Sequence, residues 1–362
     1  MRILLAPDDF AGTLTAVEAA AAITAGWRRT APDDQLDLAP LSDGGTGFLD
    51  VVRSALGGQL QPVRVKGPLG APVAAQVLIA GDTAYVESAQ AVGRHLVPPG
   101  EQDPARATSY GVGQLIAAAV DSGVRRVVVG VGGTATNDGG AGALAALGAR
   151  LDPAPDDVPD LARLERVDLT PARQRLAGVH LVAATDVDHV LAGPQGASVV
   201  FGSQKGASPV LVSLLDAALQ RWADVAGRPY ADRPGAGAGG GLGYALLLLG
   251  AVRASGAAMV LDLVNFRARA AQADLVLTGE GSFDWQSLRG KVVSEVARVA
   301  QDAGRPCVVL AGRVEVGRRE MAALGVEAAY AVPPDGAGAA AGGSAEQALA
   351  ALAAHVARSW SR

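Results

Sequence analysis

The first 56 residues read MRILLAPDDFAGTLTAVEAAAAITAGWRRTAPDDQLDLAPLSDGGTGFLDVVRSAL. Within this stretch a short apolar run at residues 2–6 stops at Pro7, as a buried strand does before a loop. An alanine-rich helical pattern follows from residue 14 to about residue 30, and Thr13 is the expected cap of that helix. The chain therefore opens with a predicted strand, loop and helix.

A second unit of the same kind comes next. A strand-like segment at residues 36–41 ends in a glycine-rich loop at residues 42–47, and a helical pattern covers residues 48–56. Two such units in succession predict an α/β fold with a parallel, doubly wound sheet of the Rossmann or flavodoxin type. In such folds ligands bind beyond the carboxyl ends of the strands.

The texture of the sequence changes after about residue 60. Short valine-rich runs with Gly-Pro and Gly-Asp turns fill residues 61–88, which indicates entry into a second domain. The rhythm of strand and helix returns between residues 275 and 359. We therefore predict a discontinuous first domain, residues 1–62 plus 262–362, with a second α/β domain, residues 63–261, inserted into it.

Composition and charge narrow the class of protein. Hydrophobic residues make up 49% of the chain and aromatic residues only 4%, which suits helices packed closely on a parallel sheet. The net charge is -5 and no dense tract of Lys and Arg occurs, so nucleic acid is not an expected partner. The longest apolar run, residues 245–252, is far shorter than the roughly 20 residues of a membrane span.

These features predict a cytoplasmic protein that acts on small molecules, with no membrane partner. The one cysteine, Cys307, lies in an apolar run at residues 306–310, so we expect a buried strand thiol and no intrachain disulfide. The sequence leaves the oligomeric state open, and a homodimer is among the states that it allows.

One glycine-rich loop is the strongest candidate for anion binding. Residues 132–140, GGTATNDGG, join a predicted strand at 126–131 to a predicted helix at 141–147. Glycine lets the backbone approach a ligand closely, and threonine adds a hydroxyl donor. The loop predicts a phosphate site, and tight packing of strand on helix is the alternative.

A second glycine-rich segment, residues 234–241, precedes a predicted helix at 242–255. Gly235, Gly237 and Gly240 match the spelling G-x-G-x-x-G, but no strand precedes them, so a nicotinamide dinucleotide site is not supported. The segment either wraps a phosphate or lets the helix pack tightly. Walker and protein-kinase motifs are absent from the sequence.

Phosphoryl transfer needs cations at the phosphates and a carboxylate that holds a metal or orients the acceptor hydroxyl. Four aspartates follow predicted strands or their terminal loops: Asp8, Asp43, Asp186 and Asp284. A helix cap or a turn is the alternative role for each. We favour Asp186 for chemistry, because Asp188 and Lys205 lie in the same polar segment.

Six motifs, in order, carry a resemblance to a known family. They read APDDF at 6–10, SDGGTG at 42–47, GVGGTATNDGG at 130–140, FGSQKGA at 201–207, PGAGAGGG at 234–241 and TGEGSFDWQS at 278–287 with GK at 290–291. Along nearly its whole length the chain resembles the type I glycerate kinases. The resemblance implies two α/β domains with a site between them, ATP and Mg²⁺, and transfer of the γ-phosphate to D-glycerate, with 2-phosphoglycerate as the favoured product.

On this basis we assign roles to residues of the motifs. Catalytic roles fall to Asp186, Lys205, Asp284 and Lys291. Nucleotide binding falls to Gly132, Gly133, Thr134, Asn137, Asp138, Gly237 and Gly239. Glycerate binding falls to Asp8, Asp43, Gly44, Gly45, Glu87 and Glu280. The metal is expected at Asp43 and Asp186.

The chain departs from the family pattern at three positions, and each change removes an ionisable group. Ala11 stands in place of lysine, Thr46 in place of glutamate and Gln114 in place of glutamate. Losing a charge near phosphates weakens transition-state stabilisation. Two alternatives therefore accompany the glycerate kinase hypothesis: a non-catalytic relative that holds nucleotide or glycerate, and a kinase for a related small hydroxy acid.

Overall fold

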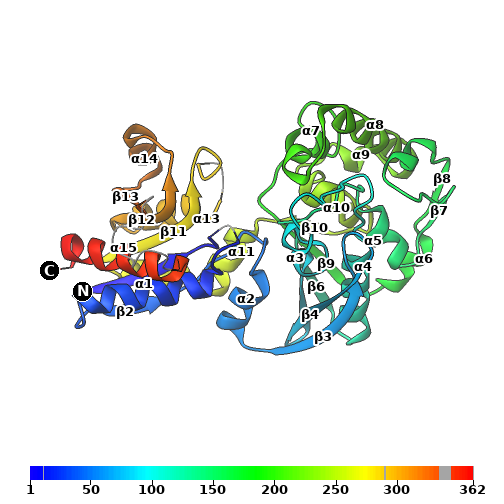
Figure 1. Ribbon diagram of the computed structural model, residues 1–362. Helices are drawn as coiled ribbons and strands as arrows, with labels where there is room; N and C mark the ends of the chain where they lie inside the picture. Colours follow the sequence, from blue (N-terminus) through cyan, green and yellow to red (C-terminus); the bar gives the residue numbers. More distant parts are fainter. Residues whose placement is uncertain (11, 289–290, 334–343, 362) are drawn as a thin grey trace. The chain divides into compact units, whose positions relative to one another are not determined.

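The computed structural model describes residues 1–362 except 11, 289–290, 334–343 and 362. It divides into two compact units (Figure 1). The first unit comprises residues 1–43, 50–56 and 257–362, and the second comprises residues 44–49 and 57–256. Compared with our predicted ranges, residues 44–49 and 57–62 fall in the second unit and residues 257–261 in the first.

The first unit is built on a five-stranded sheet in the order β13-β12-β11-β1-β2, in which all paired neighbours are parallel. The strands are β1 (Arg2–Pro7), β2 (Gln35–Leu38), β11 (Leu275–Phe283), β12 (Cys307–Val314) and β13 (Ala328–Ala331). Strand β1 lies between β2 and β11, so the direction of winding reverses beside it. That reversal is the topological switch point at which open α/β sheets bind ligands.

Helices cover this sheet, and the predicted doubly wound α/β class is confirmed. They are α1 (Ala16–Thr30), α12 (Phe266–Gln272), α13 (Val292–Asp302), α14 (Arg318–Leu324) and α15 (Ala345–Trp360), with α2 (Phe48–Leu56) and α11 (Gly256–Leu263) at the unit's boundaries. The cap of α1 is Thr15, not Thr13, because its hydroxyl accepts from the backbone N–H of Glu18 in a capping box. A Cβ on Gly26 of α1 would lie 1.9 Å from the Ala350 carbonyl oxygen of α15, so glycine permits this close contact.

The second unit has a six-stranded sheet in the order β10-β9-β6-β5-β4-β3. Its strands are β3 (Gln59–Lys66), β4 (Pro72–Ala80), β5 (Thr83–Glu87), β6 (Arg126–Gly130), β9 (His180–Ala184) and β10 (Val252–Ala254). Strands β3, β4 and β5 pair antiparallel, and the rest pair parallel. A small antiparallel pair, β7 (Arg150–Asp152) and β8 (Arg166–Asp168), lies apart from this sheet.

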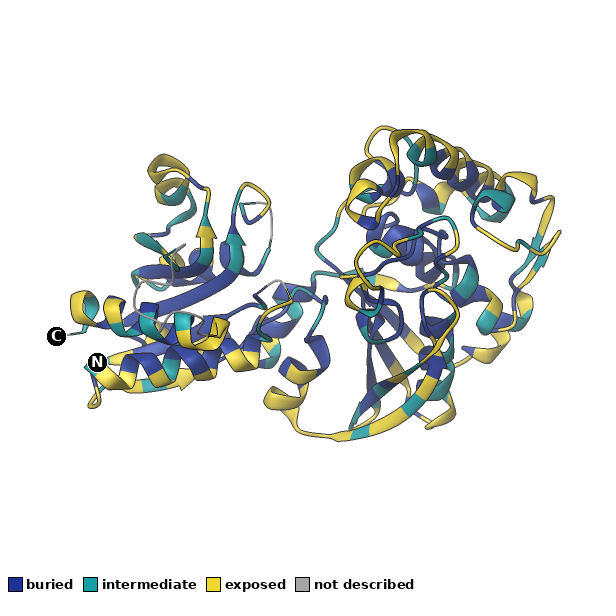
Figure 2. Cartoon of the chain, in the orientation of Figure 1, coloured by how far each residue is buried: buried dark blue, intermediate teal, exposed yellow. Residues whose placement is uncertain are grey.

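The helices of the second unit cover the buried strands (Figure 2). They are α3 (Ser88–Val92), α4 (Tyr110–Asp121), α5 (Ala141–Ala146), α6 (Thr170–Arg175), α7 (Ala197–Phe201), α8 (Pro209–Ala226), α9 (Arg228–Ala231) and α10 (Ala238–Leu248), with 3₁₀ turns η1 (Arg94–Leu96), η2 (Pro159–Arg163) and η3 (Ser203–Lys205). The helix predicted over 242–255 was wrong at its end. It stops at Leu248, and the following residues form the edge strand β10.

Two further predictions can be compared with the structure. Cys307 is fully buried in β12, as expected for a strand thiol, and burial raises its pKa to about 12. Among the described residues, no helix combines the length and the apolar character that crossing a bilayer would require.

Candidate functional site

The carboxyl ends of three neighbouring strands in the second unit lie side by side. Glu87 of β5 pairs with Gly130 of β6, which pairs with Ala184 of β9. The glycine-rich segment 44–49 rests on these strand ends, since a Cβ on Gly44 would lie 2.5 Å from the Ala184 carbonyl oxygen. A Cβ on Gly130 would lie 2.6 Å from the Gly44 carbonyl oxygen. Two motifs far apart in the sequence thus meet backbone to backbone.

Glu87 holds this segment in place. Its buried carboxylate accepts hydrogen bonds from the backbone N–H groups of Gly47 at 3.0 Å and Leu49 at 3.1 Å. Charge-assisted bonds of this kind are about twice as strong as neutral ones. Glu87 was expected to bind glycerate, and the contacts give it a positioning role toward the segment that contains Gly44 and Gly45.

The loop at residues 132–140 packs against the same segment. A Cβ on Gly132 would lie 2.8 Å from the Gly45 Cα atom, and one on Gly133 would lie 2.7 Å from the Thr46 Oγ1 atom. Gly133 also has φ +66°, a conformation that favours glycine. The glycines of this predicted phosphate loop therefore serve close packing of backbone segments at the strand ends.

The segment at residues 234–241 supports that loop from another side. Gly139 N–H donates to the Gly240 carbonyl oxygen at 3.0 Å, and the Thr136 hydroxyl donates to the Gly239 carbonyl oxygen at 3.2 Å. Gly237 N–H donates to the His189 carbonyl oxygen at 2.8 Å. Two roles were open for this segment, phosphate binding and tight packing. These contacts are packing contacts, and they involve the backbone of Gly237 and Gly239.

The far end of the loop is anchored on an aromatic side chain. The indole N–H of Trp222, a fully buried residue of α8, donates to the Gly139 carbonyl oxygen at 3.0 Å. A Cβ on Gly139 would lie 2.5 Å from the Trp222 ring. The loop is thus fixed at both ends by packing and hydrogen bonds.

Polar groups gather along this loop. The side chain of Asn137 donates to the Ser198 hydroxyl at 2.8 Å, whereas its Oδ1 atom and the Thr134 Oγ1 atom are buried and have no hydrogen-bond partner among the described residues. The buried ammonium of Lys205 donates to the Thr136 carbonyl oxygen at 2.6 Å. An unpaired buried polar atom costs free energy, so ligand atoms are natural partners for these groups.

Burial lowers the pKa of Lys205 to about 7, and the positive charge of Arg94 acts in the same direction. Sequence reasoning passed over Arg94, an exposed residue of η1. Its backbone N–H donates to the Gly133 carbonyl oxygen at 2.9 Å. No motif marks this arginine, so only the fold brings it to the loop.

Asp138 has a structural environment. Its carboxylate accepts from the backbone N–H of Ser109 at 2.7 Å and from the Ser109 hydroxyl at 2.8 Å, and from the N–H groups of Gly140 and Gly142. Burial raises its pKa, against the opposing effect of these bonds. The bonds tie the loop to the start of α4.

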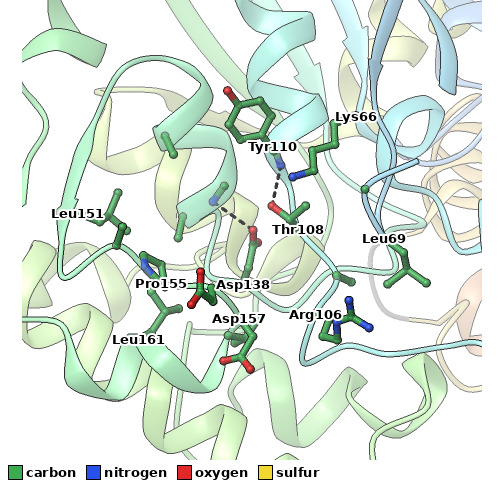
Figure 3. A pocket seen from close by; sticks show the side chains of 18 of the residues that line it. Lys66, Leu69, Arg106, Thr108, Tyr110, Asp138, Leu151, Pro155, Asp157 and Leu161 are labelled. Atoms are coloured by element: carbon green, nitrogen blue, oxygen red, sulfur yellow. Dashed lines mark hydrogen bonds between the residues drawn. The ribbon is translucent and has the colours of Figure 1, made fainter. Parts of the chain in front are cut away.

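Asp138 also lines a cavity of about 780 Å³ in the second unit, where Figure 3 shows it close to Thr108 and Tyr110. Lys66 and Arg106 also line the cavity, while Leu151, Pro155 and Leu161 supply apolar surface. The volume is that of a small-molecule pocket. Sequence reasoning did not single out this cavity, because its lining comes from segments without a shared motif.

In the first unit, carboxylates gather at the switch point between β1 and β11, where Pro7 pairs with Gly279. Burial raises the pKa of Asp8 well above its ordinary value, and the negative charges of Asp43, Asp9 and Glu280 raise it further. We call these four residues the acidic cluster. Like charges held together in this way favour a proton or a cation as a partner.

Glu280 of the acidic cluster also has a shifted pKa. Burial raises its pKa to about 7, against the lowering effects of Ser287 and Lys291, and its Oε1 atom is buried with no hydrogen-bond partner in the part of the chain that the structure describes. Lys291 therefore acts electrostatically on the acidic cluster, while Asp284 forms a turn in which its Oδ1 atom accepts from the Gln286 N–H at 2.8 Å.

Asp186 follows β9 and is partly buried. Its neighbour Asp188 forms an ion pair with Arg253. Lys205, which lies in the same polar segment of the sequence, donates to the Thr136 carbonyl oxygen of the glycine loop.

The donors of the acidic cluster suit Mg²⁺, which prefers carboxylate oxygens, and the orphaned Oε1 atom of Glu280 is consistent with a cation. Among the described residues, no three Asp, Glu, His or Cys side chains come together as a metal-holding group. Mg²⁺ commonly binds through one or two carboxylates together with substrate phosphates and water. The residues present fit a metal brought with the nucleotide.

The three departures from the family pattern have different surroundings. Ala11 lies outside the described residues. Thr46 lies beside Gly133, so the missing negative charge would have stood against the glycine loop. The Gln114 side-chain oxygen accepts from the Lys66 N–H at 2.8 Å, a role that a neutral amide fills as well as a carboxylate.

Comparisons with known proteins agree with this architecture. The model of the glycerate kinase family matches residues 3–361. The chain is 40% identical to the glycerate kinase of Halalkalibacterium halodurans, over 92% of this chain and 90% of that protein. It is 39% identical to the glycerate 2-kinase of Escherichia coli, over the same shares of the two chains.

A solved structure gives the same result. The putative glycerate kinase 2 of Salmonella typhimurium superposes with a TM-score of 0.78 at 38% identity, and the match covers 99% of this chain and 98% of that one. Sequence and structure thus agree over the full length. The chain belongs to the glycerate kinase family.

Proposed function

We propose that this protein transfers the γ-phosphate of ATP to D-glycerate and releases ADP and 2-phosphoglycerate. The observation that carries the proposal, beside family membership, is the buried ammonium of Lys205 next to the glycine loop, where Thr134 and Asn137 keep unpartnered polar atoms. A buried cation beside a free hydroxyl donor suits a phosphate group.

The reaction is an in-line displacement. The acceptor hydroxyl gives its proton to a carboxylate, for which we propose Asp186, and its oxygen forms a bond to the γ-phosphorus. The bond from that phosphorus to the β–γ bridging oxygen breaks, and ADP leaves. Lys205 and Lys291 would offset the charge of the transferred group, and the acidic cluster would supply Asp8, Asp43 and Glu280 for the polar groups of glycerate.

Mg²⁺, held by Asp43 and Asp186 together with nucleotide phosphates, would supply further charge neutralisation. Asp284 would orient its turn beside Lys291, while the glycine loop would present the phosphates to Lys205.

A coupled assay of ADP release tests the proposal across a panel of small hydroxy acids. We expect turnover with D-glycerate, and phosphorus NMR of the product should show the phosphate at carbon 2. Turnover with a different hydroxy acid alone would support the related-kinase alternative. Binding of ATP without ADP release for every acceptor would support the non-catalytic alternative and refute catalysis.

A further inference from the structure

Arg94 is fixed to the glycine loop by its backbone. Its N–H donates to the Gly133 carbonyl oxygen at 2.9 Å, and its preceding residue, Gly93, forms an antiparallel bridge with Thr134. The position of this arginine therefore follows that of the loop. Any ligand held by the loop lies within reach of the long, exposed side chain of Arg94, because the backbone of Arg94 is fixed to the loop.

The guanidinium group of Arg94 is directed toward the segment that carries Lys205. It donates to the side-chain oxygen of Gln204 at 3.2 Å, and Gln204 directly precedes Lys205. The positive charge of Arg94 acts on Lys205 strongly enough to contribute to the lowering of its pKa. The exposed cation of Arg94 and the buried cation of Lys205 are thus close enough to interact electrostatically.

Within the part of the chain that the structure describes, neither cation has a carboxylate at ion-pair distance, and the negative charge of Asp138 acts on Lys205 only at longer range. Two like charges next to each other repel, and the buried one has also lost its hydration. An anion bound between the two cations would offset both their repulsion and the lost hydration of Lys205. The unpartnered hydroxyl of Thr134 offers an additional donor on the same loop.

We infer that Arg94 and Lys205 form a two-cation clamp that binds one oxyanion of the substrates, with Lys205 at its buried end and Arg94 at its open end. The chemistry recognised is that of a phosphate or carboxylate group. Its two sources are the phosphates of ATP and the carboxylate of the acceptor acid. The inference rests on the proposed function and adds Arg94 to it as a substrate-binding residue.

Kinetics of Arg94→Gln test the clamp, because the residue is exposed and its replacement leaves the core intact. We expect KM for one of the two substrates to rise about tenfold or more, which corresponds to losing one charge-assisted hydrogen bond. Arg94→Lys should restore part of the loss, since the charge returns without the planar fork. A rise for ATP alone identifies a phosphate, and a rise for glycerate alone identifies the carboxylate.

Arg64→Gln is the matched control. Arg64 is exposed on β3 and forms no ion pair with any described residue, and the substitution removes the same unit of charge. Its kinetics should equal those of the wild type. If Arg94→Gln behaves as this control does for both substrates, the clamp is refuted.

A second test does not depend on turnover. The chain contains three lysines, Lys66, Lys205 and Lys291, so selective isotope labelling gives a lysine NMR spectrum of three side-chain signals. Lys205 is identified by its pKa of about 7, and Lys66→Arg removes a second signal. Inorganic phosphate, a non-hydrolysable ATP analogue and D-glycerate are the probes.

The probe that occupies the clamp should raise the pKa of Lys205 by more than one unit, and by less in Arg94→Gln. An unchanged pKa with all three probes at saturating concentration would overturn the inference. The two proposals fail differently. A wild-type protein without ADP release but with this shift loses the proposed function and keeps the clamp, whereas an active protein without the shift loses only the clamp.

Discussion

The two units use the same architecture to build regions of opposite charge. In the first, the carboxyl ends of β1 and β11 carry the acidic cluster, and in the second, the ends of β5, β6 and β9 carry a glycine loop with a buried lysine. The ends of parallel strands can thus support groups of either charge. The sign of the charge comes from a few side chains that the loops bury.

The two regions also respond to pH in opposite ways. The charged form of Glu280 is disfavoured in the folded state, with a pKa raised to about 7, and so is the charged form of Lys205, with a pKa lowered to about 7. The cost from Glu280 therefore builds up as pH rises from about 4.5 to 7, whereas the cost from Lys205 is full below pH 7 and fades as pH rises toward about 10.4. Each cost is one that a ligand of opposite charge relieves.

The largest expected effect comes from removing the buried cation. Lys205→Met should lower kcat/KM by about a hundredfold or more, the usual loss when a group that stabilises transition-state charge is removed. The same change should raise the free energy of unfolding at pH 6 by on the order of 2 kcal/mol, after the lost hydrogen bond to Thr136 is counted.

The sign follows from proton linkage. The pKa of Lys205 is about 7 when folded and about 10.4 when unfolded, so the cost is full below pH 7 and fades as pH rises toward 10.4. Urea unfolding at pH 6 and at pH 9 measures the change, with Lys66→Met as the control. Equal destabilisation at both values would contradict the burial of a charged lysine.

Gly240→Ala should disrupt the backbone interlock of the second unit. Its Cβ would lie 1.9 Å from the Thr136 carbonyl oxygen, at φ +69°. We expect a loss of about 2–4 kcal/mol in the free energy of unfolding. Gly81→Ala has a similar φ of +63° with nothing within 4 Å, so it isolates the backbone strain, about 1 kcal/mol. Equal losses for the two variants would rule out the steric contact.

Glu280→Gln sharpens the comparison from the acidic side. The pKa of Glu280 is raised from 4.5 to about 7 on folding, so wild-type stability falls as pH rises from about 4.5 to 7. The variant should remove that fall and gain about 3 kcal/mol at pH 8 but nothing at pH 4. Denaturant titrations across this range measure it, with the exposed Glu327→Gln as the control. A gain that is the same at both pH values would argue against a buried carboxylate.

Glu87→Gln should give the smallest effect. A glutamine offers one acceptor oxygen where the carboxylate offers two, so either Gly47 or Leu49 loses its bond. We expect the free energy of unfolding to fall by about 1–2 kcal/mol. Thermal unfolding measures the loss, and an unchanged midpoint would show that the segment at 44–49 holds its position without Glu87.

Local pattern predicted most of the fold. The strand and helix of the opening unit and the glycine loop at 132–140 have clear periodicity and turn residues, and each lies where the pattern placed it. The end of the helix predicted over 242–255 was missed, because the apolar run continues into strand β10 and periodicity alone does not separate the two.

The site was harder to predict, because its contacts depend on tertiary structure. No sequence pattern indicates that Glu87 accepts hydrogen bonds from the backbone of the segment at 44–49, or that Lys205 donates to the Thr136 carbonyl oxygen. Arg94 is one of many arginines without a motif, and only its bond to Gly133 brings it to attention. Motifs identify loops, whereas the partners of their side chains come from the packing.

The hydrogen bond from Trp222 to Gly139 has a consequence for the energetics of binding. Because the aromatic ring and the Gly240 backbone already fix the glycine loop, the loop has little conformational entropy left to lose when a ligand arrives. Such preorganisation makes the affinity depend on the ligand's own contacts. The glycine loop is therefore preorganised, and the hydrophobic core on which it packs fixes its shape.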